Sequence, residues 1–289
     1  MRVLLITGMS GSGKSVVLRV LEDAGYYVID NLPARFVQEM VVALDKSGER
    51  RLALGVDVRS GGESLANLPD VVRGLRRLGH TIQVLFLTTD TPTLVARYSE
   101  TRRRHPLSQG DGSRTLEECI ALERRLLGPL DGVGQMIDTS DLRPQVLRAW
   151  VLDFISNERT GITLSFVSFA YKQGVPLDAD LVFDVRCLPN PHYDPALRAL
   201  TGRDQPVIDY LRALPVVTAM IDDIGGFLDR WLPAYEHDNR SYLTVAIGCT
   251  GGQHRSVYCV ETLAARFRLA EPVLVRHRGL DGSAPRHPG

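Results

Sequence analysis

Short apolar runs alternate with stretches of helical periodicity through the first half of the chain. Compact apolar runs predict strands, and apolar residues that recur every three or four positions predict helices. The predicted strands are Val3–Thr7, Tyr27–Ile29, Leu52–Asp57, Val84–Thr88 and Gln135–Ile137. The predicted helices are Ser15–Asp23, Pro33–Ser47, Leu68–Leu78, Thr91–Thr101, Leu116–Leu127 and Leu142–Phe154. This βα alternation is typical of an α/β domain with a mostly parallel sheet and helices on both faces.

The polar stretch "SNERTG", residues 156–161, separates this series from a second one. The second predicted strands are 162–169, 181–185, 241–248 and 271–277, and the second predicted helices are 206–214, 216–232 and 255–268. We therefore expect a first domain over 1–155, a linker over 156–161 and a smaller α/β domain over 162–289. The tail 280–289 is rich in Gly and Pro, and we expect it to be disordered.

Composition narrows the class of protein. The 289 residues, 44% of them hydrophobic, suit two domains at roughly 100–200 residues each. Because 34 basic residues balance 34 acidic ones, contact with nucleic acid would need a local patch. The four cysteines form no CxxC pair, which indicates neither a zinc site nor a disulfide framework, and Cys187 and Cys259 are expected in the core. No apolar run approaches the ~20 residues of a membrane helix, so the protein is predicted to be cytoplasmic, without membrane contact.

The stretch "GMSGSGKS" matches the phosphate-binding pattern G-x-x-x-x-G-K-[ST] in full. It follows a predicted strand and opens a predicted helix, which is the context that such a P-loop requires. Backbone N–H groups would converge on phosphates, Lys14 would reach the β- and γ-phosphates, and the Ser15 hydroxyl would ligate Mg²⁺. The predicted nucleotide-binding residues of this loop are Gly8, Met9, Ser10, Gly11, Ser12, Gly13, Lys14 and Ser15.

Three aspartates follow predicted strands, at the edge where parallel sheets bind ligands. Asp57 is predicted to hold Mg²⁺. The candidate catalytic residues are Lys14 and Asp30, and Asp30 would act as a base. Asp90 is predicted to cap a helix, and capping is the alternative for Asp30 as well. The run "RYSETRRRHPLS", residues 97–108, resembles the lid of small kinases, whose arginines close on phosphates; a solvated basic helix end is the alternative.

A second glycine-bearing turn, "GCTGGQHRS", lies between a predicted strand and a predicted helix. The N–H groups of Thr250, Gly251 and Gly252 could form a nest for an anion, with the Arg255 guanidinium beside it. Three interpretations stay open. The turn is a sensor pocket for an anionic metabolite, a phosphatase site with Cys249 and Arg255 in C-x5-R spacing, or a structural turn in which Arg255 pairs with a carboxylate. The phosphatase interpretation lacks an identifiable aspartate acid.

Several long blocks resemble the RapZ family of P-loop nucleotide-binding proteins. They are "YYVIDNLP", "DVRS", "RYSETRRRHPLS", "IDTSDL", "FVSFAYKQGVPLDADLVFDVRCLPNPHYDPALRALTGRDQPV" and "IGCTGGQHRSV", besides the P-loop itself. The resemblance implies a kinase-like N-terminal domain that binds ATP and GTP and hydrolyses them weakly. It assigns ATP to the P-loop and GTP to "DVRS", that is Asp57, Val58, Arg59 and Ser60. On physical grounds this segment could instead complete a single nucleotide and metal site.

For the second domain, the resemblance implies a pocket that binds an amino-sugar phosphate. The protein would use this binding to regulate amino-sugar synthesis. The matching contacts would be His192, Thr250, Gly251, Gly252, His254 and Arg255. The family further implies a homo-oligomer and, in some members, small-RNA binding helped by a basic C-terminal tail, of which this chain keeps few cations. We therefore predict a regulatory binder of ATP, GTP and Mg²⁺. The alternatives are a P-loop small-molecule kinase, with its acceptor between the lid and Asp30, and an RNA-binding adapter.

Overall fold

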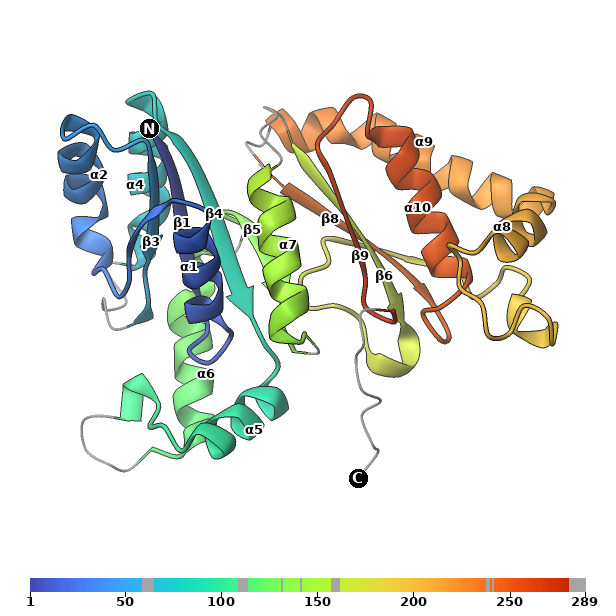
Figure 1. Cartoon of the computed structure of the whole chain (residues 1–289), viewed down its shortest axis with the longest axis horizontal. Coiled ribbons are helices and arrows are strands. Elements are labelled where there is room, and N and C mark those ends of the chain that lie inside the picture. The colour runs from blue at the N-terminus through green and yellow to red at the C-terminus, as the bar shows by residue number, and fades with distance from the viewer. Residues whose placement is uncertain are drawn as a thin grey trace. The chain divides into compact units, whose positions relative to one another are not determined.

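The computed structural model contains two compact units, Met1–Leu152 and Asp153–Gly289 (Figure 1). The structure describes residues 1–58, 65–108, 114–130, 132–140, 142–156, 162–237, 240 and 242–280. Three predictions from the sequence fall wholly or mostly outside these residues: the roles of Arg59 and Ser60, the linker from residue 157 onward, and the tail from residue 281. Within the described part, no helix combines the length and the apolar character that crossing a membrane requires.

The N-terminal unit is built on a five-stranded parallel sheet with the strand order β2-β3-β1-β4-β5. Its strands are β1 (Arg2–Gly8), β2 (Tyr27–Ile29), β3 (Arg51–Gly55), β4 (Thr81–Thr88) and β5 (Gln135–Asp138). Strand β1 is central, and its residues are buried on both faces of the sheet. Such burial on both sides is what a near-continuous apolar run predicts for a parallel strand.

In the described part of this unit the α-helices are α1 (Lys14–Asp23), α2 (Val37–Lys46), α4 (Leu68–Arg77), α5 (Thr91–Thr101), α6 (Leu116–Leu127) and α7 (Pro144–Ser156). Val3 and Leu5 of β1 share a buried cluster with apolar residues of α2, α4 and α6. Their neighbours in sequence, Leu4 and Ile6, point to the opposite face. Helix α1 covers that face, because its Leu18 lies against Gly55 of β3. The predicted layering, with helices on both faces, is confirmed.

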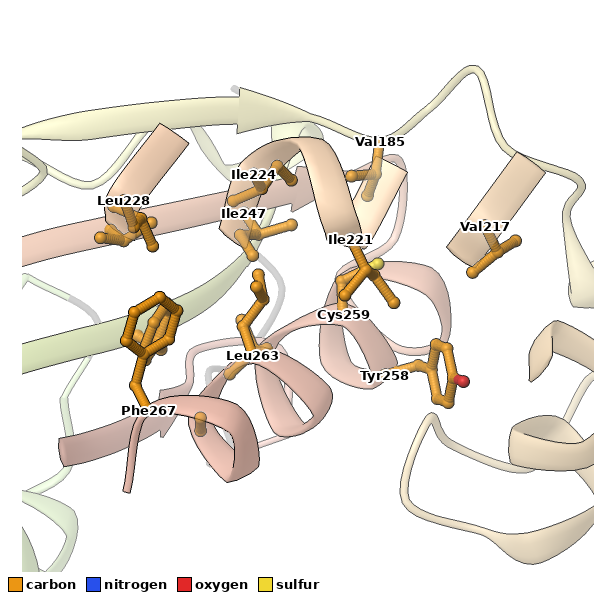
Figure 2. Packing of buried hydrophobic residues seen from close by; sticks show 14 of the residues in the cluster. Val185, Val217, Ile221, Ile224, Leu228, Ile247, Tyr258, Cys259, Leu263 and Phe267 are labelled. Carbon is orange, nitrogen blue, oxygen red and sulfur yellow. The ribbon is translucent and has the colours of Figure 1, made fainter. Parts of the chain in front are cut away.

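The C-terminal unit has a four-stranded parallel sheet with the order β7-β8-β6-β9. Its strands are β6 (Thr163–Ala170), β7 (Leu181–Asp184), β8 (Tyr242–Cys249) and β9 (Val273–His277). Helices α8 (Gln205–Arg212), α9 (Pro215–His237) and α10 (Arg255–Phe267) complete it. Figure 2 shows Ile221 and Leu228 of α9 facing Leu263 and Phe267 of α10, with Ile247 of β8 in the same cluster. The predicted α/β class thus holds for both units.

Several element ends differ from the sequence prediction, among them those of β3 and α9. Strand β3 ends at Gly55 rather than at Asp57, because the Gly55 carbonyl accepts a hydrogen bond from the N–H of Leu32 in a loop. Helix α9 continues to His237 through Pro233, five residues beyond its predicted end at Leu232. A proline removes one helical hydrogen bond but does not end a helix that packing holds. Leu228 and Leu232 on the buried side of α9 provide that packing.

Candidate functional site

The P-loop joins β1 to α1 through a backbone path that requires glycine. Gly8 has φ 129°, and a Cβ there would overlap the carbonyl oxygen of Leu87 in the neighbouring strand β4. Gly13, at the start of α1, has φ 103°. Residues other than glycine rarely adopt these positive φ angles, so the turn depends on the two glycines for its shape. The predicted strand, turn and helix around "GMSGSGKS" are therefore present in the structure.

This turn leaves donors available for an anion. Among the described residues, no acceptor bonds the backbone N–H groups of Gly11, Gly13 or Ser15, which lie at and before the first turn of α1. The Lys14 ammonium donates to the carbonyls of Gly8 at 2.7 Å and Met9 at 3.2 Å, so its charge lies over the same loop. Unpaired N–H groups at a helix N-terminus beside a lysine form a phosphate cradle.

The three predicted aspartates occupy different environments. Asp57 is 6% exposed and follows β3, which pairs with β1, so it lies at the same sheet edge as the P-loop. Asp30 is exposed, and its Oδ1 accepts a hydrogen bond from the N–H of Asn31. Asp90 accepts a hydrogen bond from the N–H of Thr93 at 2.8 Å, which confirms its predicted role as the cap of α5.

Magnesium suits the oxygen donors at this edge. The Ser15 hydroxyl is exposed at the start of α1, and Asp57 supplies a carboxylate. Magnesium prefers one or two such protein oxygens together with water and phosphate oxygens. Among the described residues, no group of three or more His, Cys, Asp or Glu side chains forms a metal cluster of its own. The donor set therefore fits a metal that arrives with a nucleotide.

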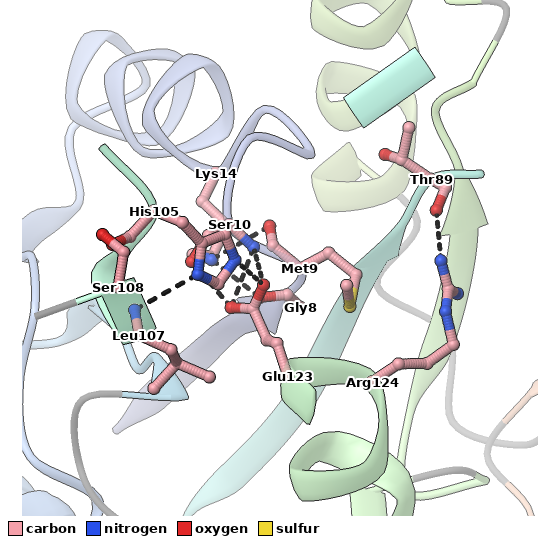
Figure 3. A network of polar contacts seen from close by, with 10 residues as sticks. All are labelled: Gly8, Met9, Ser10, Lys14, Thr89, His105, Leu107, Ser108, Glu123 and Arg124. Carbon is pink, nitrogen blue, oxygen red and sulfur yellow. Dashed lines mark hydrogen bonds and ion pairs between the residues drawn. The ribbon is translucent and has the colours of Figure 1, made fainter. Parts of the chain in front are cut away.

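A buried carboxylate beneath the P-loop is absent from the sequence prediction. Glu123 of α6 accepts hydrogen bonds from the Ser10 N–H at 3.0 Å and the Ser10 hydroxyl at 2.6 Å, and it contacts His105 Nε2 at 3.0 Å. Figure 3 shows Glu123 between the P-loop and the segment with His105. Burial opposes ionisation of Glu123, but the hydrogen bonds from His105 and Ser10 outweigh it and lower its pKa. One signal was available: Glu123 lies on the apolar stripe of its helix, with Cys119 and Leu127.

The second turn joins β8 to α10 at the carboxyl edge of the other sheet. Cys249 ends β8, and its sulfur accepts a hydrogen bond from the Gly252 N–H at 3.2 Å and contacts the Ser256 hydroxyl at 3.2 Å. The thiol is 3% exposed and does not line the neighbouring cavity. A nucleophile must reach its substrate, so this position does not favour the phosphatase interpretation.

The Arg255 side chain is 4% exposed, and it bonds backbone carbonyl groups rather than a carboxylate. Its guanidinium donates to the carbonyls of Arg186 at 2.7 Å and Leu188 at 2.8 Å and to the Thr250 hydroxyl at 3.3 Å. Among the described residues it bonds no carboxylate, so the pairing that the structural-turn interpretation would give Arg255 is absent there. Its buried Nε has no partner in this part of the chain. A buried, unsatisfied donor is costly unless a ligand or water accepts from it.

A cavity of about 570 Å³ opens beside Arg255. Its lining includes Arg186, Asn190, Tyr193, Tyr210, Thr250 and Arg255. Of the six predicted metabolite contacts, only Thr250 and Arg255 belong to this lining. His192 and Gly251 are exposed, Gly252 is buried, and the roles of all six stay predictions. His254 Nε2 lies 3.1 Å from the Leu197 carbonyl, and burial lowers the pKa of this histidine.

Two residues of the C-terminal unit, Arg186 and Cys187, were missed or misjudged from the sequence. Arg186 holds Asp184 through two nitrogens and lies over the Tyr171 ring, with its central carbon 3.8 Å from the ring centroid. Arg186 lies within a block that resembles the RapZ family, but its contact with the Tyr171 ring could not be inferred from that block. Cys187 is exposed, which contradicts the prediction that it lies in the core. Cys259 is buried as expected, and burial raises the pKa of its thiol to about 12.

Comparison with known families decides the classification. Residues 1–159 match the RapZ-like N-terminal domain, and residues 162–281 match the RapZ C-terminal domain. The chain belongs to the RapZ family. A nucleotide-binding protein of Bordetella avium is 59% identical over 282 residues, which cover 96% of this chain and 97% of that one. A nucleotide-binding protein of Herminiimonas arsenicoxydans is 56% identical over 288 residues, covering 97% and 100%.

Two solved structures show a distant likeness to this RapZ-family chain. A sugar kinase from Janibacter is 16% identical with a TM-score of 0.38, and it covers 54% of this chain and 95% of its own. Shikimate kinase from Acinetobacter baumannii, solved with shikimate, is 20% identical with a TM-score of 0.34, covering 55% and 94%.

Proposed function

We propose that this RapZ-family chain binds a magnesium nucleotide at Gly8–Ser15 and an anionic phosphometabolite beside Arg255. It acts as a regulator that hydrolyses its nucleotide slowly, and the two ligands influence each other. One observation supports the nucleotide most directly: the P-loop keeps N–H groups open next to Lys14. The relatives' name, nucleotide-binding protein, agrees with this proposal.

Each P-loop residue has a definite task in this proposal. Lys14 exchanges its bonds to the Gly8 and Met9 carbonyls for bonds to the β- and γ-phosphates. Ser15 and Asp57 hold Mg²⁺, which neutralises phosphate charge when bound. Asp30, exposed at the same sheet edge, takes the proton from the attacking water.

Calorimetry of the full-length chain tests the nucleotide site. We expect saturable, Mg²⁺-dependent binding of ATP that Lys14→Ala abolishes and Arg255→Ala preserves. If both variants still bind ATP, the assignment of ATP to the P-loop is contradicted. GTP titrated into protein already saturated with a non-hydrolysable ATP analogue distinguishes one site from two. Displacement of the analogue supports a single site completed by Asp57, whereas additional saturable binding supports GTP at 57–60.

The unpaired Nε of buried Arg255, a residue that lines a cavity of about 570 Å³, is the observation that supports the metabolite site. A phosphate accepts from such a fork in two places at once. We propose an amino-sugar phosphate as the ligand. Calorimetry should show binding of glucosamine 6-phosphate but not of glucosamine, and Thr250→Ala should weaken it while Lys14→Ala leaves it unchanged. Equal binding of both sugars would exclude phosphate recognition.

The remaining expectations have separate tests. A P-loop kinase would form a phosphorylated product at rates near ~10 per second, the median for enzymes, whereas a regulator would release only phosphate and slowly. Small-RNA binding predicts salt-dependent retention of structured RNA on filters. Homo-oligomer formation predicts a mass by light scattering that is a multiple of the chain mass.

A further inference from the structure

The N-terminal unit has a second cavity, of about 500 Å³, between the end of α5 and the start of α6. Arg103, Arg104 and Arg114 line it, and no acidic side chain is among the described residues of the lining. All three arginines are exposed, and in the described part of the chain none makes a hydrogen bond or an ion pair. Three unpaired guanidinium groups around one cavity repel each other and attract a ligand with several negative charges.

The chemistry of the lining favours phosphate as the charged group. A guanidinium presents paired N–H donors in a rigid plane, which matches phosphate and carboxylate oxygens, and several of them converge here. The hydroxyls of Ser99 and Ser108 already donate to backbone carbonyls, so uncharged polar recognition is weak in this cavity. A ligand would be held mainly by its charge.

Two rings separate this cavity from the P-loop. Tyr98 and His105 both line the cavity, with ring centroids 5.4 Å apart. On its other side, the Tyr98 ring packs against the P-loop, because a Cβ at Gly11 would lie 3.4 Å from it. No residue of Gly8–Ser15 lines the cavity. The cavity is therefore distinct from the phosphate cradle but only one side chain away from it.

His105 also connects the cavity to the P-loop backbone. Its Nε2 lies 3.0 Å from Glu123 Oε2, and the Glu123 carboxylate accepts from the N–H of Ser10 at 3.0 Å (Figure 3). The other ring nitrogen, Nδ1, accepts from the Leu107 N–H at 3.2 Å, which ties the ring to its own loop. All of these groups except Leu107 are buried. Loss of either partner would cost the buried Glu123 carboxylate free energy. A displacement of His105 is therefore expected to move Glu123 and, with it, Ser10.

We propose that this cavity binds a second phosphate-bearing anion, separate from the P-loop nucleotide, and that His105, Glu123 and Ser10 couple the two sites. The coupling rests on the proposed nucleotide function, whereas the anion site does not. A ligand held by Arg103 and Arg104 fixes the segment that carries His105. It thereby stabilises the P-loop in its present shape, so each ligand strengthens the binding of the other.

The anion site is tested by calorimetry with inorganic pyrophosphate. The protein is the full-length chain with Arg255→Ala, which removes the other anion cradle, saturated with a non-hydrolysable ATP analogue and excess Mg²⁺. We expect one pyrophosphate per chain, with roughly tenfold weaker affinity or less in Arg103→Ala and in Arg104→Ala. Arg125→Ala is the matched control, because Arg125 is an exposed arginine of α6 outside the cavity lining.

Three results would overturn the site: no pyrophosphate binding, binding that the ATP analogue abolishes, or equal weakening by Arg125→Ala. The second result would make the arginines part of the nucleotide site. These failures are distinguishable from failure of the nucleotide proposal, in which the analogue itself does not bind the parent protein.

The coupling has its own readout in the affinity for the ATP analogue. Pyrophosphate also competes at the P-loop, so its effect is compared between the parent protein and His105→Gln. At saturating pyrophosphate, we expect the affinity for the ATP analogue to be about fivefold higher in the parent protein than in His105→Gln. A factor of about five is the lower end of typical coupling between two sites. Glu123→Gln keeps the shape of the side chain and should give the same loss of coupling. An equal effect of pyrophosphate in all three proteins would refute the link. Thermal unfolding verifies that the variants are folded.

Discussion

A partly buried network in the C-terminal unit makes its stability depend on pH. Glu261 of α10 accepts a hydrogen bond from Arg203 Nε at 2.6 Å and lies 3.0 Å from His277 Nε2. The other nitrogen of His277, in β9, lies 2.7 Å from the Ser168 hydroxyl of β6. The hydrogen bond to His277, and then that to Arg203, outweigh burial and lower the pKa of Glu261 from 4.5 to about 2.

The size and sign of the effect follow from this pKa. At about 1.4 kcal/mol for each pH unit, the full difference would be worth about 3 kcal/mol. Because the Glu261 side chain is 31% exposed, solvent screening reduces its contribution to about 1–2 kcal/mol. In the unfolded chain, Glu261 takes up a proton near pH 4.5, whereas in the folded chain it stays ionised down to about pH 2. The contribution is therefore complete above pH 4.5 and is lost as the pH falls through this window.

The perturbation is Glu261→Gln, measured by urea unfolding in a Trp150→Phe background. The sequence has two tryptophans, so fluorescence then reports Trp231 of α9 and the C-terminal unit alone. We expect Glu261→Gln to lower the free energy of unfolding by about 1–2 kcal/mol at pH 7 and by less than about half of that at pH 3. Asp223→Asn, at an exposed carboxylate of α9, is the control. An equal loss at pH 7 and pH 3 would refute the reasoning.

Three further changes test individual features of the N-terminal unit. Gly8→Ala should destabilise the unit by several kcal/mol and abolish nucleotide binding, because its Cβ meets the Leu87 carbonyl; urea unfolding and calorimetry measure both effects. Asp90→Ala should cost about 1 kcal/mol of unfolding free energy through the lost bond to Thr93, and Asp90→Asn should recover most of it. Asp57→Asn should remove the Mg²⁺ dependence of nucleotide binding while metal-free binding persists; unchanged Mg²⁺ dependence would show that Asp57 is not a metal ligand.

Local signals explain why most of the fold was predictable. The P-loop is encoded within eight consecutive residues, and its two constrained glycines fall where the pattern requires them. The central strands β1, β6 and β8 were recognisable from apolar runs, since burial on both faces leaves little room for polar residues. The end of β3 was not predictable, because it depends on the Leu32 N–H, which comes from another part of the chain.

Long-range contacts explain what the sequence did not reveal at the sites. Ser10 and Glu123 are 113 positions apart, so no local pattern links them, although a glutamate on an apolar helix stripe does indicate a buried partner. Arg255 could be identified from its turn, but its partners could not. The carbonyls of Arg186 and Leu188 are backbone groups, which leave no trace in side-chain identity.

The two cradles hold their cations differently, and under the proposed function this difference would suit them to two different ligands. Lys14 is partly exposed at the end of a flexible stem, and its two carbonyl acceptors can be exchanged for phosphate oxygens at little cost. Arg255 is buried, and its bonds to Arg186 and Leu188 also fix the segment that lines the cavity. A movable lysine suits a ligand that is bound, cleaved and released. A fixed guanidinium with one open donor suits a ligand whose presence is only sensed, because binding there requires no rearrangement of the charge.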